Sequence, residues 1–323
     1  MVEETLDAAL SVFQPDLPLA IGFSGGADST ALLYACAARW PGQVYAVHIN
    51  HGLQVAASAF ENQCIAVCNR LDIPLTVIPM SAHAAPGQSP EAAARLARYE
   101  GFAQFVHQSQ QQIAIKNIAL AHHADDQIET FLIALSRGAG LAGLSAMPAR
   151  LERQGITYWR PLLGVSADEI RQWLAKNERQ FVDDPTNDDM RFLRNKIRRQ
   201  LLPPLKQTFA HFRQPFARSL AHIAQAQALL EEIAEADLAA VLPDAVGMPG
   251  PDIKALQKLS ANRQVNVVRY WLVSCHRVIP STAQLTELLQ QVADCTTRGH
   301  QIQIKVAHGK VLRRDDCLAW YNP

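Results

Sequence analysis

Short aliphatic runs alternate with amphipathic stretches along the first half of the chain. Four runs have the length and composition of buried strands: 19–23, 44–49, 75–79 and 117–121. Helical periodicity fills the intervals, and Ser89 followed by Pro90 suits the start of a helix that runs to about 109. Strands that alternate with helices at these spacings predict an α/β fold with a doubly wound parallel sheet and helices on both faces.

The second half of the chain has a mainly helical pattern. Helices are predicted at 167–177, 191–200, 214–240, 252–275 and 281–293. The glycine-rich stretch 136–144 is typical of a loop, and Pro203-Pro204 is expected to end the basic helix before it. Alternation over 299–321 predicts a small terminal hairpin. We therefore expect an α/β domain over 1–213 and a mainly helical domain over 214–323.

Composition excludes several classes of protein. The 323 residues are 49% hydrophobic and 19% charged, which is typical of an ordinary globular protein. No apolar run is long enough to span a membrane and no signal peptide is visible, so a cytoplasmic location is expected. The six cysteines form no Cys-x-x-Cys pair, which argues against zinc and iron–sulfur sites. The formal net charge is zero, so any contact with nucleic acid must come from local clusters of cations.

The loop after the first predicted strand has the chemistry of a phosphate site. It reads Ser24, Gly25, Gly26, Ala27, Asp28, Ser29. Adjacent glycines allow close approach of the backbone to a ligand, and the start of the next helix offers N–H groups to an anion. The spacing matches neither the P-loop nor the Gly-x-Gly-x-x-Gly loop. A carboxylate among phosphates needs a bridging cation, for which Mg²⁺ is suited. The alternative is a glycine-rich turn that binds nothing.

Polar side chains follow two other predicted strands where those strands end. His51 follows the second strand, and His122-His123 follow the fourth. Ligands of parallel sheets bind at the carboxyl ends of the strands, so these stretches should converge with the glycine loop. Asp126 and Glu129 then share one face of a helix. This cluster favours a substrate or Mg²⁺ site, and complementing of the helix dipole or a zinc site are the alternatives.

A cluster of cations lies between residues 191 and 199, with no acid among them. It comprises Arg191, Arg194, Lys196, Arg198 and Arg199. Three of the arginines fall on one face of the predicted helix. Such a cluster predicts a surface that binds phosphate. The alternative is a solvated charged face.

The motifs together resemble the tRNA(Ile)-lysidine synthetase family of the N-type ATP pyrophosphatase (PP-loop) superfamily. The matching segments are 24–29, 48–53, 91–99, 122–130, 136–140, 160–162, 184–187 and 194–198. The first segment marks the superfamily alone. The arginine-rich segment and Asp-Asp-Gln-Ile-Glu-Thr at 125–130 point to this family within it.

The resemblance implies an ATP-dependent ligase. Such an enzyme joins free L-lysine to C2 of the wobble cytidine of tRNA(Ile) with a CAU anticodon, through an adenylated tRNA, and releases AMP and pyrophosphate. ATP and Mg²⁺ are the implied cofactors, tRNA(Ile) and lysine the implied partners, and a homodimer is compatible with the family. The tail domain is expected to bind tRNA, and this chain looks short for the further C-terminal domain of some members.

The resemblance also implies roles for individual residues. Residues 24–29 would bind the pyrophosphate of ATP, with Asp28 holding Mg²⁺, while adenine would lie near Ile49, Asn50 and His51. Asp126 and Glu129 would bind the ammonium of lysine, and Arg98 its carboxylate. Asp28, Asp126 and His123 are the expected catalytic residues. Phosphates of ATP or tRNA would meet the cations Arg191, Arg194, Lys196 and Arg198.

Three other functions compete with this one. A tRNA-thiolating relative needs cysteines for sulfur or a cluster, and the chain lacks the paired motif. An amidating ligase similar to NAD synthetase needs neither the basic segment nor the second domain. An RNA-binding protein without catalysis would leave Asp28 and the carboxylate cluster without a role.

Overall fold

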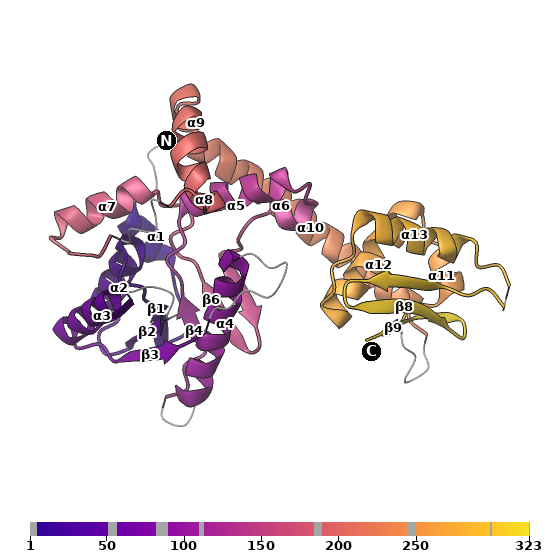
Figure 1. Ribbon diagram of the computed structural model, residues 1–323, viewed down its shortest axis with the longest axis horizontal. Helices are drawn as coiled ribbons and strands as arrows, with labels where there is room; N and C mark the ends of the chain where they lie inside the picture. The colour runs from indigo at the N-terminus through magenta and orange to yellow at the C-terminus, as the bar shows by residue number, and fades with distance from the viewer. Residues whose placement is uncertain are drawn as a thin grey trace. The chain divides into compact units, whose positions relative to one another are not determined.

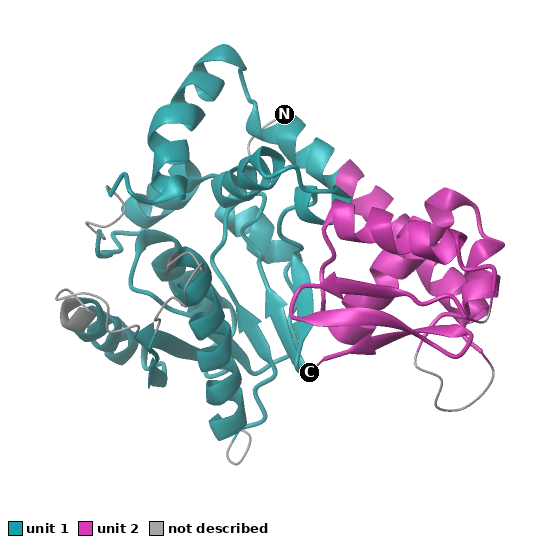
Figure 2. Cartoon of the chain, turned by 45° about the vertical axis from the view of Figure 1, so that its right-hand side comes forward, with its two compact units in different colours: residues 1–221 teal, residues 222–323 magenta. Residues whose placement is uncertain are grey.

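The computed structural model describes residues 5–50, 57–81, 90–109, 113–183, 189–243, 250–297 and 299–322. The chain forms two compact units, residues 1–221 and 222–323 (Figure 2). The boundary falls inside one long helix, α10 (Arg213–Val241). No described helix is both long and apolar enough to cross a membrane.

A six-stranded sheet forms the centre of the first unit, in the order β3-β2-β1-β4-β6-β5 (Figure 1). Its strands are β1 (Leu19–Gly22), β2 (Val44–Asn50), β3 (Leu75–Pro79), β4 (Asn117–Ala119), β5 (Arg150–Arg153) and β6 (Ile156–Trp159). All neighbours pair in parallel except β5 with β6. The predicted parallel sheet is therefore confirmed, but the β5–β6 hairpin was missed because β5 is short, polar and largely exposed.

Helices cover both faces of this sheet. One face packs against α1 (Leu6–Val12), α2 (Ala27–Arg39), α3 (Ala57–Leu71) and α7 (Ala167–Lys176). The other face packs against α4 (Pro90–Ser109), whose Phe102 and Phe105 are buried in one cluster with Ile118 and Tyr158 of the sheet. Apolar burial on both faces explains why the strands are continuous aliphatic runs in the sequence.

Two predictions about the middle of the chain are wrong. The glycine-rich stretch contains a short helix, α6 (Leu141–Leu144), after α5 (Ala124–Ser136). Pro203-Pro204 do not end a helix but lie in the first turn of α9 (Leu202–Thr208), where the N–H groups that proline lacks have no partner within the helix. The basic segment before them comprises α8 (Leu193–Lys196) and a π-helical turn at Ile197–Leu201.

The second unit is a helical layer over a small antiparallel sheet. It contains α11 (Ile253–Gln257), α12 (Ala261–His276), α13 (Thr282–Ala293), β7 (Gln303–Val306), β8 (Gly309–Arg314) and β9 (Cys317–Tyr321). The single helix predicted at 252–275 is thus two, because Ser260 starts a new helix. The predicted hairpin gains a third strand. Leu256, Trp271, Leu288 and Val311 belong to the core between the layers.

Candidate functional site

The loop between β1 and α2 has the geometry of an anion cradle. Gly25 has a φ of +84°, a conformation that favours glycine, and a Cβ there would approach Cys64 Sγ to 3.2 Å. Ser29 Oγ accepts from the Ser24 backbone N–H at 3.2 Å and donates to the Gly26 carbonyl at 3.1 Å. The two serines thus stabilise the loop through hydrogen bonds within it, and the backbone N–H groups at the start of α2 are the main donors that it offers to an anion.

A second element, the start of α5, meets this loop through His123. His123 is 4% exposed and caps α5, and its backbone N–H donates to Asp126 Oδ2 at 3.0 Å. Its ring Nε2 lies 3.6 Å from Asp28 Oδ2 on α2 and 3.6 Å from Asp126 Oδ2. The two stretches that the sequence placed at neighbouring strand ends therefore meet at one imidazole.

The protonation of these groups is set by burial and by their neighbours. Burial raises the pKa of Asp28, although its side chain is 41% exposed and solvent moderates the shift. Burial alone would raise the pKa of Asp126 too, but His123, His122 and Arg198 outweigh it and hold that pKa below its usual value. Burial lowers the pKa of His122 to about 3, so its ring is neutral at physiological pH. The site thus combines an ionised carboxylate with a neutral imidazole.

Two arginines of the basic segment bind the carboxylates of α5, although their side chains stay 30% and 37% exposed. Arg194 Nη1 donates to Glu129 Oε2 at 3.1 Å, and Arg198 donates to both Glu129 oxygens. Arg198 Nη2 also donates to Asp126 Oδ1 at 2.9 Å. Glu129 has no exposed surface, so a lysine ammonium reaches it only if these side chains move. Its predicted contact with lysine stays a prediction, and its observed role is to position the two arginines.

Asp125 makes contacts that the sequence did not reveal. Arg213, the first residue of α10, donates to Asp125 Oδ1 through Nε at 2.7 Å. The other oxygen of Asp125 accepts from the Ala167 backbone N–H, at the start of α7, at 3.0 Å. One buried carboxylate therefore fastens three helices beside the site. The only hint in the sequence was its place in the Asp-Asp-Gln motif.

Other predicted residues fall into two groups. Arg98 lies near Asp126 and makes neither a hydrogen bond nor an ion pair with the described residues. The residue as a whole is exposed, but burial around its guanidinium lowers the pKa of that group. Asn50 closes β2 and donates to Glu61 Oε2 at 2.7 Å, with Ile49 beside it. His51 and the segment 184–187 lie outside the described residues, as does Ser89. The other three cations of the basic segment are exposed: Arg191 pairs with Asp189 at 2.7 Å, and Lys196 and Arg199 lie on the surface.

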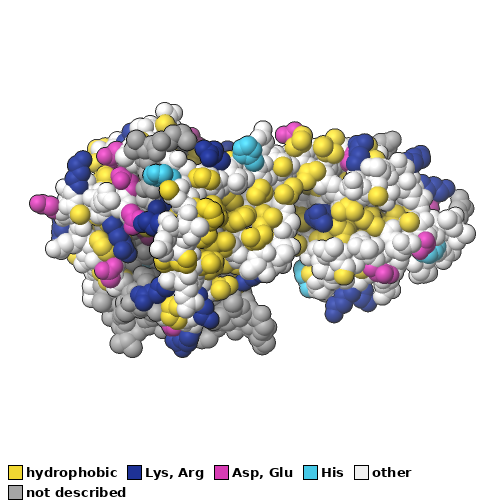
Figure 3. All heavy atoms as spheres, turned by 90° about the horizontal axis from the view of Figure 1, so that it is seen from above, with side chains coloured by type: hydrophobic (Ala, Val, Ile, Leu, Met, Phe, Trp, Pro, Cys, Tyr) yellow, Lys and Arg dark blue, Asp and Glu magenta, His cyan; other side chains and the backbone are white. Residues whose placement is uncertain are grey.

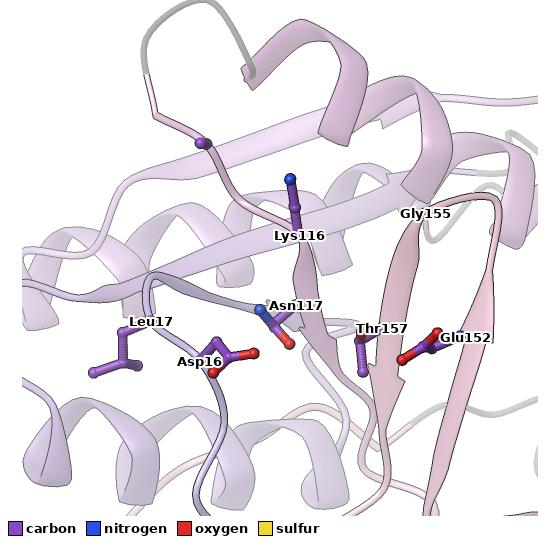
Figure 4. A pocket seen from close by; sticks show the side chains of 8 residues that line it. Asp16, Leu17, Lys116, Asn117, Glu152, Gly155 and Thr157 are labelled. Carbon is purple, nitrogen blue, oxygen red and sulfur yellow. The ribbon is translucent and has the colours of Figure 1, made fainter.

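Two further surface features lie apart from this cluster. A polar hollow of about 420 Å³ lies at the amino ends of β1, β4 and β6, opposite the strand ends that carry the site, with Asp16, Lys116 and Glu152 in its lining (Figure 4). Figure 3 shows hydrophobic side chains gathered over α5, α6 and the start of α10, where Leu135 is 53% exposed. Neither feature includes Asp28, His123, Asp126 or the arginines that bind the carboxylates of α5.

The donor set near Asp28 fits a shared Mg²⁺ ion better than a metal held by protein alone. Mg²⁺ takes oxygen ligands and in nucleotide sites needs one or two carboxylates together with phosphate oxygens. Asp28 accepts no hydrogen bond within the described ranges, and Asp126 lies across the same imidazole. Among the residues with described positions, no group of three or more His, Cys, Asp and Glu suits a metal ion. Phosphates would have to supply the remaining ligands.

Comparisons with known proteins identify the family. The family model of the PP-loop domain matches residues 2–205, and that of the TilS substrate binding domain matches residues 252–319. The tRNA(Ile)-lysidine synthase of Polaromonas naphthalenivorans (strain CJ2) is 52% identical over 317 residues, which are 98% of this chain and 93% of that protein. The protein of the same name from Coxiella burnetii (strain RSA 493 / Nine Mile phase I) is 37% identical, and the match covers 90% of this chain but 65% of that protein.

A solved structure shares the fold at low identity. The U34-tRNA thiolase NcsA from Methanococcus maripaludis matches with a TM-score of 0.56 and 14% identity, over 67% of this chain and 75% of that one. That likeness concerns the fold alone, whereas the match to the lysidine synthases extends over nearly the whole chain at high identity. The chain therefore belongs to the tRNA(Ile)-lysidine synthase family.

Proposed function

We propose that this protein joins free L-lysine to C2 of the wobble cytidine of tRNA(Ile) with a CAU anticodon, at the expense of ATP. The C2 oxygen attacks the α-phosphorus of ATP and releases pyrophosphate, and the lysine amine then displaces AMP. The observation that carries the proposal is the meeting of the glycine loop and the α5 motif, with His123 3.6 Å from both Asp28 and Asp126. This reaction needs positioning and neutralisation of charge more than a protein nucleophile.

The glycine loop and Asp28 are suited to ATP. The N–H groups at the start of α2 would bind the pyrophosphate, and the carboxylate of Asp28 would hold Mg²⁺ against it. Bound Mg²⁺ would neutralise charge on the phosphates. Adenine would lie at the end of β2, near Ile49 and Asn50.

The lysine substrate would lie between Arg98 and Asp126. Arg98 makes no ion pair with the described residues, which leaves its guanidinium for the lysine carboxylate, and the carboxylate of Asp126 is suited to an ammonium group of lysine. Arg194 and Arg198, held by Glu129, would direct their remaining N–H groups at phosphate. His123, between two carboxylates, is placed to accept a proton from the attacking amine.

The two parts of the chain would divide the work. The α/β domain, which we place at 1–213, would carry the chemistry, and the remaining residues 214–323 would help to bind tRNA. The match of residues 252–319 to a substrate binding domain supports this division. We place the protein in the cytoplasm, and a homodimer is compatible with the family.

The decisive experiment measures incorporation of labelled lysine into a tRNA(Ile) transcript with a CAU anticodon, in the presence of ATP and Mg²⁺. A methionine tRNA with the same anticodon is the control. Labelling of the isoleucine tRNA alone is expected, and D28N should abolish it while tRNA affinity stays unchanged. Cleavage of ATP to AMP and pyrophosphate without labelling would indicate another PP-loop tRNA-modifying or amidating enzyme instead.

A further inference from the structure

The small sheet of the second unit has two very different faces. Its residues alternate along β7 and β8, with Ile304, Val306 and Val311 buried against the helices. The opposite side, which we call the outer sheet face, carries these exposed side chains: Gln303, Lys305, Lys310, Arg314 and Tyr321. Figure 1 shows α11, α12 and α13 together on the other side of these strands. By register Cys317 and Ala319 of β9 also lie on this side but are buried, so the exposed part of the outer sheet face is formed by β7, β8 and Tyr321.

The charges on this face oppose one another. Lys305 lies directly across from Lys310, and Lys310 lies across from Tyr321, so the two lysines and the tyrosine form one row across the sheet. Like charges in directly opposite positions of an antiparallel pair destabilise the sheet. Neither lysine makes an ion pair or a side-chain hydrogen bond with any residue that the structure describes. Because Lys305 and Lys310 destabilise the sheet and have no described partner in the protein, their position is explained better by binding to an external anion than by a structural role.

The neighbouring arginines sharpen the contrast. The Arg313 guanidinium donates to the carbonyl of Thr297 at 2.7 Å and contacts Asp316 at 3.3 Å, so its charge is used inside the unit. Arg314, the next residue, points to the other side, is exposed, and has no partner among the described residues. The outer sheet face therefore presents three cations and one aromatic ring, while Asp252, which lies in the same row as Arg314 and Cys317, accepts from the Ala255 backbone N–H as the cap of α11.

We propose that the outer sheet face binds the phosphate backbone of the tRNA. The proposal rests on the function proposed above, and it assigns to particular side chains a contact that a chain of zero net charge must make through local clusters. Lysines and arginines bind phosphate without regard to sequence, and a tyrosine supplies a hydroxyl donor and an aromatic surface. A row of unpaired cations on a sheet complements a polyanion, whereas an apolar partner would leave these charges buried without partners.

The test compares two double variants of the full chain that remove the same charge. K305Q/K310Q changes the outer sheet face, and K254Q/K258Q changes one lysine in α11 and one at its C-cap, in the same unit. Binding of a tRNA(Ile) transcript is measured over a range of salt concentrations. K305Q/K310Q should weaken binding by roughly tenfold and make the slope of log K against log salt shallower by about 1.8, since each phosphate contact contributes about 0.9. K254Q/K258Q should change both by much less.

Further readouts separate this inference from its alternatives. K305Q/K310Q should melt at the same or a higher temperature than the natural protein, because the repulsion is gone. Its KM for tRNA should rise while kcat and the KM for lysine stay unchanged. Equal losses in both double variants would overturn the inference, as would loss of binding to phosphatidylserine-rich vesicles with tRNA binding intact. If the natural protein makes no lysidine, the proposed function fails, and the binding comparison still decides whether this face takes RNA.

Discussion

Each unit of the molecule contains a buried carboxylate bound to arginine, and the two differ in what surrounds them. In the first unit, Glu129 has no exposed surface and accepts from Arg194 and Arg198. In the second, Asp237 on α10 is 1% exposed and accepts from Arg263 on α12, with the Nε contact at 2.9 Å. By chemistry and burial alone, the two clusters look equivalent.

The residues around each ion pair distinguish the Glu129 cluster, which belongs to the candidate site, from the Asp237 pair, which only joins two helices. Arg198 links Glu129 to Asp126, and Asp126 lies 3.6 Å from the His123 ring, which in turn lies 3.6 Å from the partly exposed Asp28. Arg98 of α4 also lies near Asp126. Beside Asp237, the described residues of the same two helices share the apolar core of this unit and one further hydrogen bond, from Asn266 Nδ2 of α12 to the Leu230 carbonyl of α10 at 2.7 Å. A buried ion pair is thus weak evidence of function by itself. Available charged groups that converge on the pair are stronger evidence.

The largest expected effect is the difference in activity between the variants R198A and R263A, each of which removes the arginine from one of the two clusters. R198A leaves Glu129 buried with one guanidinium fewer, which should lower the free energy of unfolding by about 3 kcal/mol. Because Arg198 also reaches Asp126, lysidine formation should fall by about 100-fold or more. R263A should lower the melting temperature and leave kcat within about twofold. Melting curves and single-turnover rates of both variants give the comparison, and equal kcat in the two would refute it.

A smaller effect is expected at Asp125, which positions the site without facing it. D125N keeps the size of the side chain but removes the charge that Arg213 binds at 2.7 Å. We expect kcat to fall by about tenfold, because small displacements of catalytic groups are costly, while the KM for ATP changes little. R213K should retain more activity than R213A. If D125N lowers only the melting temperature, Asp125 has a purely structural role.

A pH effect should follow from His122. Its pKa is about 3 in the folded protein against 6.5 ordinarily, so the unfolded chain binds the proton more readily. The resulting stability is fully present above about pH 6.5 and is lost as the pH falls toward 3, by up to about 1.4 kcal/mol per pH unit. Urea unfolding between about pH 5 and pH 7 should show a shallower pH dependence for H122Q. Parallel curves for the two proteins would contradict the low pKa.

The smallest effect should come from Arg191. Its side chain is 87% exposed and pairs with Asp189, so R191A should leave the melting temperature unchanged. If Arg191 meets phosphate as the sequence predicts, tRNA affinity should fall only a few-fold and the salt slope should become shallower by about 0.9. An unchanged slope would make Arg191 part of a solvated face.

Much of the fold followed from local properties of the sequence. The aliphatic runs predicted the parallel strands correctly, because these strands are buried on both faces. The loop after β1 needs a left-handed residue, and the glycine at position 25 meets that need locally. The strand β5 escaped prediction because its exposed polar residues carry no such pattern. The prediction from Pro203 and Pro204 was wrong because proline breaks the interior of a helix but is tolerated in its first turn, where both residues lie.

The sequence by itself determined which residue types gather at the strand ends, since topology brings the ends of parallel strands to one edge of the sheet. Only the tertiary structure decided how those residues pair. Glu129 and Arg198 are 69 positions apart, and Asp125 and Arg213 are 88 apart. Helical spacing shows that charges share a face, but the partner of that face depends on packing between distant elements. Ion pairs of this kind form only when long loops close, so no local pattern encodes them.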